Sequence, residues 1–336
     1  MLCAVSPVTH VTNRPVNSFV PEHPAISVLI PLYNKQGEVR RAIASVLAQS
    51  VSDYELIVVD DGSTDDGPRM VASISDPKLR MVHQANAGVS AARNRGVSEA
   101  RAEVVAFLDA DDEWLPDLLE TIVRLVSNFP ECRVYATGYA YAHAGRRARP
   151  AILRGLPRGF REGILDDYFR VAAHSDPPLW SSAVAVQKAA LQMVGGFPVG
   201  IASGEDLLTW ARLACSYRVA YSVQPRALYW IPSDLSARRE RTPAEPDLVA
   251  EGLAGLLNKT PPEERVALEH YCSHWKRMRG VDCLKQGKRQ KALVEFNAAC
   301  RYSGASGRLR LMKTLAQLPA GDTAFRALLH LRACLR

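Results

Sequence analysis

The sequence predicts an α/β protein with a Rossmann-like, mostly parallel central sheet covered by helices on both faces, followed by a small all-α region. Three observations support this prediction. Short apolar runs alternate with stretches of helical spacing up to residue 126. Acidic clusters directly follow two of the apolar runs, and open α/β sheets bind ligands at such strand ends. After residue 247 only helical spacing remains.

The first 130 residues are predicted to alternate strand and helix. The apolar run 26–30 predicts a first strand that ends at Pro31. Apolar residues recur at helical spacing between 37 and 49. By the same criteria, further strands are expected at 56–59, 79–83 and 104–108, and further helices at 65–73, 90–100 and 118–126.

The pattern from 130 to 236 is less regular, and the remainder is helical. Strands are expected at 134–141, 183–186, 219–223 and 227–231, and a helix at 207–215. The C-terminal helices are expected at 248–258, 263–286, 288–302, 308–318 and 322–335. The predicted organisation is a loose leader over 1–24, a large domain over 25–237, a linker over 238–247 and a helical region over 248–336.

Composition narrows the class of protein. The 336 residues are 47% hydrophobic and 23% charged, as expected of a soluble globular protein. No apolar run approaches the roughly 20 residues that span a bilayer. The seven cysteines are scattered and form no C-x-x-C pair, which argues against a disulfide framework or a zinc site and favours a reducing cytoplasm.

The two acidic clusters are the main candidates for chemistry. One is Asp60-Asp61-Gly62-Ser63-Thr64-Asp65, and the other is Asp109-Ala110-Asp111-Asp112. Carboxylates crowded at a strand tip repel one another and lose hydration. A divalent cation carrying a polyphosphate is a usual way to offset that cost.

Six motifs occur in order along the chain. They are Pro31-Leu32-Tyr33-Asn34, the first acidic cluster, the segment Gln84–Gly96, Phe107–Asp112, Gly195-Gly196-Phe197 and Gly204-Glu205-Asp206. Together they resemble a family 2 glycosyltransferase with the GT-A fold, a nucleotide-diphospho-sugar transferase. The resemblance covers residues 24–236.

The resemblance implies a donor site with the following members: Pro31, Tyr33, Asn34, Asp61, Arg93 and Asp109. Tyr33 would close over the base, or is simply a loop aromatic. Asp61 would accept the N3–H of a uracil ring, and Arg93 would bind the diphosphate. A surface salt bridge is an equally weighted alternative for Arg93.

The other acidic residues of the first cluster are expected to be structural. Asp60 would hold the turn through bonds to Gly62 and Ser63. Asp65 is expected to cap a helix rather than bind a ligand.

The resemblance also implies a cation site and a general base. Asp109 would face the ribose and metal-bound water, Asp111 would bind Mn²⁺ or Mg²⁺ directly, and Asp112 is a third candidate ligand. Asp206 is expected to be the base that deprotonates the acceptor hydroxyl, with Glu205 second. Helix capping is the alternative for this pair.

Two further segments bear on the site. Trp180, Ser181 and Ser182 would border an acceptor pocket, and a structural role for Trp180 is equally favoured. The segment 228–233 departs from the family, because it lacks the Tyr-Arg or His-containing stretch of many relatives. We therefore expect no third metal ligand there.

The expected function is inverting, metal-dependent transfer of a sugar from a nucleoside diphosphate sugar, with UDP favoured. The acceptor would be a hydroxyl of a glycan, a lipid-linked molecule or a protein. The alternative is a non-catalytic nucleotide-sugar-binding or scaffold protein of the same fold. A nucleotidyltransferase is disfavoured, because the segment 31–37 lacks a glycine- and lysine-rich phosphate loop.

Positive charge is concentrated in the C-terminal third. Residues 238–336 hold 19 Lys and Arg against 10 Asp and Glu, whereas residues 1–237 hold 23 against 25. Such a surface suits an anionic membrane, and a solvated helical face explains it as well. We expect a cytoplasmic protein with a possible peripheral membrane contact and no nucleic-acid partner. The segment 322–335 is imperfectly amphipathic, and core packing is favoured over membrane contact for it.

Overall fold

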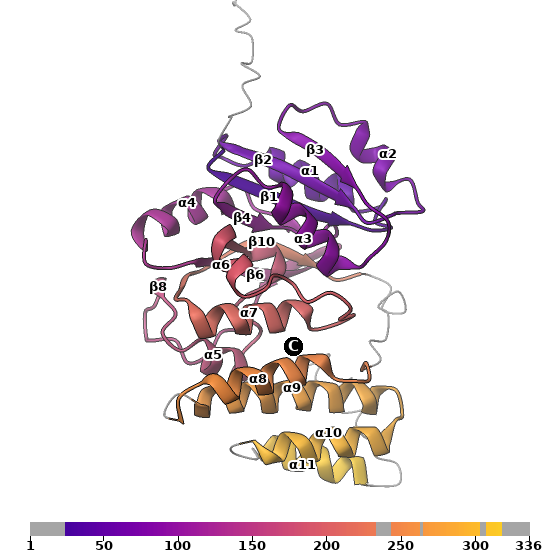
Figure 1. Cartoon of the computed structure of the whole chain (residues 1–336), viewed down its shortest axis with the longest axis vertical. Helices are drawn as coiled ribbons and strands as arrows, with labels where there is room; N and C mark the ends of the chain where they lie inside the picture. The colour runs from indigo at the N-terminus through magenta and orange to yellow at the C-terminus, as the bar shows by residue number, and fades with distance from the viewer. Residues whose placement is uncertain (1–23, 233–242, 263–264, 303–306, 318–336) are drawn as a thin grey trace, which may run out of the picture.

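The computed structural model describes residues 24–232, 243–262, 265–302 and 307–317. A central sheet lies between two layers of helices, and the C-terminal helices are stacked below one of those layers (Figure 1). The fold class is therefore as predicted. The expected leader, except for its last residue, and the expected helix at 322–335 lie outside the described residues.

The N-terminal half of the sheet is parallel, as the sequence predicts. Strands β3 (Leu79–His83), β2 (Tyr54–Asp60), β1 (Ile26–Leu32) and β4 (Val104–Phe107) lie side by side in that order. Each apolar run of this half became one strand, and β1 and β2 are buried along their whole length. All four carboxyl ends consequently lie at one edge of the sheet.

The other half of the sheet is mixed. Strand β9 (Val184–Gln187) runs antiparallel between β4 and β6 (Val134–His143), and β6 pairs in parallel with β10 (Val219–Trp230). Three short strands that the sequence did not predict complete the sheet: β5 (Glu113–Trp114), β7 (Arg146–Pro150) and β8 (Glu162–Ile164).

Pro31 does not end the first strand, contrary to the prediction. It lies inside β1, opposite Val59 of β2. Along a parallel strand, successive residues direct their backbone groups to alternate sides. The Leu29 carbonyl accepts a bond on the β4 side and the Leu32 carbonyl accepts one on the β2 side. Pro31 thus faces the β4 side, where pairing has already ended, so its missing N–H costs no ladder bond.

The two strands predicted at 219–223 and 227–231 are one strand, β10. Its pairing with β6 shifts register between Ser222 and Pro225 and again between Pro225 and Ala227. Pro225 cannot donate a ladder bond, and the irregularity lets the strand continue past it.

Helices cover both faces of the sheet. On one face, α1 (Val39–Leu47), α2 (Gly67–Ala72) and α4 (Leu118–Asn128) pack against alternate strand residues such as Ile30 and Leu56. The opposite face, which includes Leu29 and Ile57, packs against four helices: α3 (Val89–Glu99), α5 (Tyr168–His174), α6 (Lys188–Met193) and α7 (Glu205–Ser216).

The C-terminal helices continue that second layer. Helices α8 (Leu248–Lys259) and α9 (Arg265–Lys285) share one hydrophobic core with α5 and α7. Helices α10 (Arg289–Arg301) and α11 (Gly307–Gln317) pack on the distal part of α9 around a separate small core (Figure 1). Within the described ranges, none of these helices has the length and apolarity needed to traverse a lipid bilayer.

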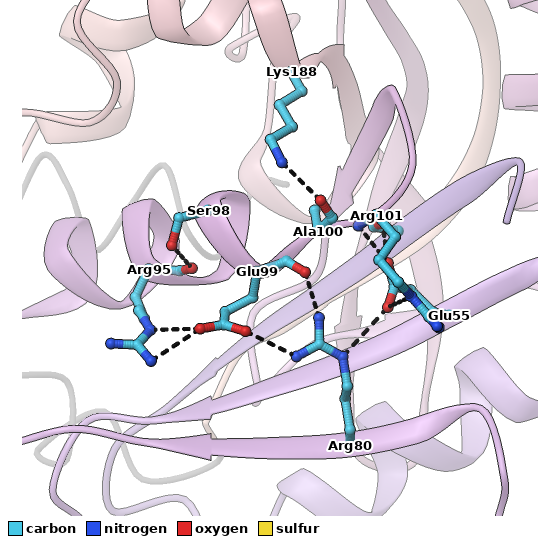
Figure 2. Close-up of polar contacts among 9 residues, drawn as sticks. Glu55, Arg80, Arg95, Ser98, Glu99, Ala100, Arg101 and Lys188 are labelled. Carbon is cyan, nitrogen blue, oxygen red and sulfur yellow. Dashed lines mark hydrogen bonds and ion pairs between the residues drawn. The ribbon is translucent and has the colours of Figure 1, made fainter. Parts of the chain in front are cut away.

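A charge network around the buried Glu55 closes the amino-terminal edge of the sheet (Figure 2). Glu55, 1% exposed, accepts bonds from Ser27 Oγ at 2.6 Å and from the amide and guanidinium of Arg101 at 2.7 and 3.0 Å. Arg80 joins Glu55 to Glu99 at the end of α3. The network ties β2 and β3 to the loop before β4, on the edge opposite the acidic clusters.

Candidate active site

Three acidic groups converge at the carboxyl edge of the sheet. Asp60 is the last residue of β2 and Asp61 follows it, Asp109 and Asp111 follow β4, and the third group opens helix α7. Arg93 connects the second and third groups, because it pairs with both Asp109 and Glu205. The sequence placed the first two groups together through strand order, but it gave no position for the third.

The first cluster is held by loops that follow neighbouring strands. Asp60 accepts the Ser63 amide at 3.0 Å and contacts His83 Nδ1 at 3.0 Å, in keeping with its expected turn-holding role. Asp65 accepts the amide of Gly67, the first residue of α2, at 2.9 Å and the Gln36 amide at 2.9 Å, but the N-cap of α2 is Asp66.

The Asp61 carboxylate is largely occupied by the protein itself. It is 3% exposed and accepts bonds from Gln84 Nε2 at 2.7 Å and from the amides of Ala87 and Gly88 at 2.9 and 2.8 Å. A carboxylate offers about four acceptor positions. One position therefore remains for a ligand, and the expected contact to a uracil ring stays a prediction.

The loop after β1 is bonded to the first cluster. Asn34 has a left-handed backbone (φ 51°), and its Oδ1 accepts the Thr64 amide at 2.8 Å. The Asn34 amide donates to Ser63 Oγ at 3.1 Å. Tyr33 is 43% exposed beside this junction, and its role in closing over a base stays a prediction. Pro31 is buried within the strand.

Arg93 occupies the centre of the site. Its guanidinium donates to Asp109 Oδ1 at 2.8 Å and to Glu205 Oε1 at 3.1 Å, and its side chain is 4% exposed. It also lies 5.2 Å from the centroid of the Phe197 ring. Arg93 thus forms salt bridges, as the alternative held, but they are buried and not at the surface. In this arrangement the guanidinium bonds carboxylates, and contact with a diphosphate would require it to exchange partners.

Asp111 is the accessible carboxylate of the second cluster. Its side chain is 39% exposed and pairs with Lys35 Nζ at 2.7 Å. Burial alone would lower the pKa of Lys35, but the Asp111 carboxylate raises it. Lys35 was missed as a site residue, although its place directly after the Asn34 motif was a usable signal.

Asp109 has a more enclosed environment. It is a quarter exposed, and burial raises the pKa of its carboxyl group. Its amide donates to Ser182 Oγ at 3.1 Å.

Asp109 and Asp111 offer the oxygen ligands that Mg²⁺ and Mn²⁺ accept. Among the residues that the structure describes, no three His, Cys, Asp or Glu side chains converge on one point. Mg²⁺ commonly takes one or two carboxylates together with substrate phosphates. The donor set therefore fits a cation that a bound diphosphate helps to hold, rather than a cage built by the protein alone.

Asp112, our third candidate metal ligand, is instead a buried structural carboxyl. It is 1% exposed, and its Oδ2 accepts bonds from Ser182 Oγ at 2.5 Å and Trp180 Nε1 at 3.1 Å. Its Oδ1 accepts the Trp230 amide at 3.2 Å. Burial, with Asp109 and Asp111 nearby, raises the pKa of Asp112 to about 8. Both of its oxygens are engaged by protein donors, which disfavours the metal-ligand role.

Glu205 and Asp206 have different environments at the start of α7. Glu205 is 8% exposed and bonded to Arg93, and burial together with the Asp206 charge raises the pKa of Glu205 to about 7. Asp206 is half-buried; one oxygen accepts the Leu207 amide at 2.7 Å and the other a long 3.4 Å bond from Ser181. The N-cap of α7 is Gly204, so Asp206 does not cap the helix, and one of its oxygens is held only by the long bond from Ser181.

The segment 180–182 joins these acidic groups, a connection that the sequence did not reveal. Ser182 bonds Asp112 and the Asp109 amide, and Ser181 bonds Asp206. The Trp180 ring is half-buried and stacks at 5.4 Å on Tyr139. Trp180 therefore has a structural role, and the acceptor-pocket role is untested.

The part of the chain that carries the two acidic clusters is also the part that resembles known proteins. Residues 27–180 match the family model described as glycosyl transferase family 2. This part of the chain belongs to glycosyl transferase family 2. The matched segment includes both acidic clusters and ends before the Glu205–Asp206 pair of α7.

Relatives of this glycosyltransferase family 2 segment include the uncharacterized glycosyltransferase YibD of Escherichia coli. It is 42% identical over 102 residues, which is 30% of this chain and 30% of YibD. The match thus spans less than a third of the relative's length.

Two solved structures share the GT-A fold. Staphylococcus aureus TarS 1-349, solved in complex with UDP-GlcNAc, has a TM-score of 0.65 and 17% identity, over 89% of this chain and 88% of that one. The mannosyltransferase PcManGT of Pyrobaculum calidifontis, solved with GDP-Man and Mn²⁺, has a TM-score of 0.57 and 21% identity, over 90% and 84%.

Proposed function

We propose that this protein transfers a sugar from a nucleoside diphosphate sugar to a hydroxyl acceptor, with a divalent cation and with inversion at the anomeric carbon. The observation that carries the proposal is the bridge through Arg93. It brings the Asp109–Asp111 cluster, which suits a cation and a diphosphate, against the acidic start of α7, which supplies a base.

The donor would occupy the edge formed by the loops after β1, β2 and β4. Tyr33 and Asn34 flank the base, and the remaining acceptor position of Asp61 suits a ring N–H. UDP is the proposed nucleotide. Fold neighbours solved with UDP-GlcNAc and with GDP-Man show that the fold accommodates either base, so the experiment includes both.

Asp111 and Asp109 would hold the cation, Mn²⁺ or Mg²⁺. When bound, the ion supplies charge neutralisation for the departing diphosphate. Lys35 would have to release Asp111 as the cation binds, because the two side chains are in contact at 2.7 Å. The released ammonium would remain close to the phosphates, where a positive charge also stabilises them.

Asp206 is the proposed general base. Glu205 is 8% exposed and bonded to Arg93, so it is poorly placed to meet an acceptor. Asp206 has an oxygen held only by a long contact to Ser181. That oxygen can accept the hydroxyl proton as the acceptor oxygen attacks the sugar from the face opposite the diphosphate.

The acceptor and the cellular location belong to the same proposal. Glycan, lipid-linked and protein hydroxyls are all compatible acceptors. The net positive charge of the C-terminal third would favour an anionic membrane surface, where lipid-linked acceptors reside. We keep the domain limits that the sequence pattern predicts as a proposal. They are a large domain over 25–237, a linker over 238–247 and a helical region over 248–336.

Two substitutions test the mechanism. Asp111→Asn should abolish Mn²⁺-dependent binding of UDP-sugar, measured by calorimetry, because it removes a charged oxygen ligand. Asp206→Asn should keep donor binding and lower transfer by roughly two to four orders of magnitude. The exposed Asp66→Asn is the matched control, since the Asp66 carboxylate pairs with Arg69 on the surface. Wild-type transfer by Asp206→Asn would refute the base assignment.

The non-catalytic alternative has its own outcome. A thermal-shift screen of UDP-, GDP- and dTDP-sugars, with and without Mn²⁺, identifies the donor. Stabilisation by a donor, with neither transfer nor hydrolysis of its sugar across a panel of acceptors, would favour a nucleotide-sugar-binding protein.

A further inference from the structure

We propose that Trp275, on helix α9 of the C-terminal helical region, is a positioning residue that fixes the turn carrying Glu205 and Asp206. This inference rests on the proposed function, in which Asp206 is the base. It assigns the C-terminal helices, which lie outside the segment matched by the family model, a part in building the active site.

The turn lies directly against Trp275. Gly204 precedes α7 with a left-handed backbone (φ 86°). A Cβ at this position would lie 2.6 Å from Cη2 and 2.9 Å from Cζ3 of Trp275, and 3.2 Å from Val249 Cγ2. Only a residue without a side chain permits this backbone conformation and this approach. The indole ring and the turn therefore define each other's position.

The following residues of α7 are held from the same side. A Cβ on Gly252 of α8 would lie 2.7 Å from Leu208 Cδ2. The Tyr271 hydroxyl of α9 donates to the Leu207 carbonyl at 3.4 Å. The first turns of α7 thus contact α8 and α9 at several successive positions, next to both carboxylates.

Trp275 itself is fixed by a buried charge cluster. Its Nε1 donates to Asp247 Oδ1 at 3.1 Å, and Asp247 Oδ2 lies 2.7 Å from Lys276 Nζ and 3.1 Å from Arg279 Nε. Arg279 also contacts Glu295 of α10 at 2.7 Å. These four charged side chains are at most 16% exposed. The indole is consequently held by Asp247, which precedes α8 and is linked through Arg279 to Glu295 of α10.

The position of the turn at Gly204 sets the position of both carboxylates at the start of α7. Glu205 and Asp206 are the two residues after Gly204, so a shift of the turn moves both carboxylates together. A displacement of about 1 Å in a catalytic group can cost up to roughly a hundredfold in rate. Asp111, the accessible cation ligand, pairs with Lys35 and not with a residue of this turn, and only Asp109 is linked to Glu205, through Arg93. Loss of Trp275 should therefore affect kcat more than donor affinity.

The experiment compares Trp275→Ala and Trp275→Leu with Trp275→Phe in the full chain. The first two should lower kcat by roughly tenfold or more, with donor Kd changed less than about threefold, and the phenyl ring should restore most of kcat. Phe296→Leu is the control, because it trims a buried aromatic side chain of α10 in the separate core. It should lower Tm while leaving kcat per folded molecule unchanged.

A second readout does not depend on activity. Amide hydrogen exchange of residues 204–209 should accelerate in Trp275→Ala and Trp275→Leu but not in Phe296→Leu. Unchanged exchange there in the folded variants, or a kcat loss equal to that of Phe296→Leu, would overturn the positioning role. If wild type transfers no sugar, the proposed function fails, while the exchange result still decides whether Trp275 holds the turn.

Discussion

Arg93 donates a 3.1 Å hydrogen bond to Glu205 across 112 positions of the sequence, and both side chains are buried. The same guanidinium bonds Asp109. One cation thus neutralises a carboxylate from each half of the site. Because both carboxylates are largely withdrawn from water, the pairing has consequences for stability as well as for function.

Removing the Arg93 charge should destabilise the fold. Arg93→Met leaves Asp109 and Glu205 buried without their shared partner, and breaking a buried pair costs about 3–5 kcal/mol. Urea denaturation gives the free energy of unfolding. Arg95→Met on the same helix is the control, since its exposed pair with Glu99 contributes only about 0.5 kcal/mol. Equal losses in the two variants would contradict the central role of Arg93.

Without divalent cations, stability should fall as the pH rises from about 4 to about 8. The folded-state pKa values of Asp112 and Glu205, about 8 and about 7, lie above those of the unfolded chain. The folded protein therefore retains protons that the unfolded chain has released, and its stability declines through this window. Each group contributes at most about 1.4 kcal/mol per pH unit.

Asp112→Asn isolates one of these groups. The altered hydrogen bonds of the variant lower its unfolding free energy by the same amount at every pH. The buried amide that replaces the Asp112 carboxyl does not ionise as the pH rises. Its Tm should therefore rise relative to wild type between pH 5 and pH 8, measured with chelator present. Parallel Tm profiles for the two proteins would show that Asp112 is already ionised in the fold.

Gly96→Ala should disrupt the packing of α3 on β1. A Cβ there would lie 2.0 Å from Cδ1 and 2.4 Å from Cγ of Leu29. We expect a loss of about 1–3 kcal/mol in unfolding free energy, as for overpacked cores. Gly255→Ala in α8 has nothing within 4 Å and should instead stabilise by about 0.5–1 kcal/mol. A neutral Gly96→Ala would show that α3 can move off the strand without cost.

Glu55→Gln should lower stability without changing the transfer rate. The substitution removes the charge that faces Arg80 and Arg101 in the network of Figure 2, at a cost of about 2–4 kcal/mol. This network lies at the opposite edge of the sheet from the acidic clusters, so kcat should stay within about twofold of wild type. The exposed pair of Glu162 with Arg124 supplies the control Glu162→Gln, for which a change below about 1 kcal/mol is expected. A large kcat loss in Glu55→Gln would reveal coupling between the two edges.

The sequence determined the order of strands and helices and the place of the acidic clusters. Periodicity is a local property, so the apolar runs at 56–59 and 79–83 predicted β2 and β3 closely. Parallel strands align their carboxyl ends, so Asp61 and Asp109 could be expected at one edge. Short strands such as β5 were not predictable, because a two-residue strand exists only through its partner.

Only the tertiary structure decided which charge meets which. Arg93 could be assigned to solvent or to a phosphate until α7 brought Glu205 beside it. Asp112 and Asp111 are adjacent in sequence, yet one is enclosed by protein donors and the other faces Lys35. The contact of Trp275 with Gly204 likewise joins segments 71 positions apart. These outcomes depend on long-range packing and on competition for burial and hydrogen bonds, which local periodicity does not encode.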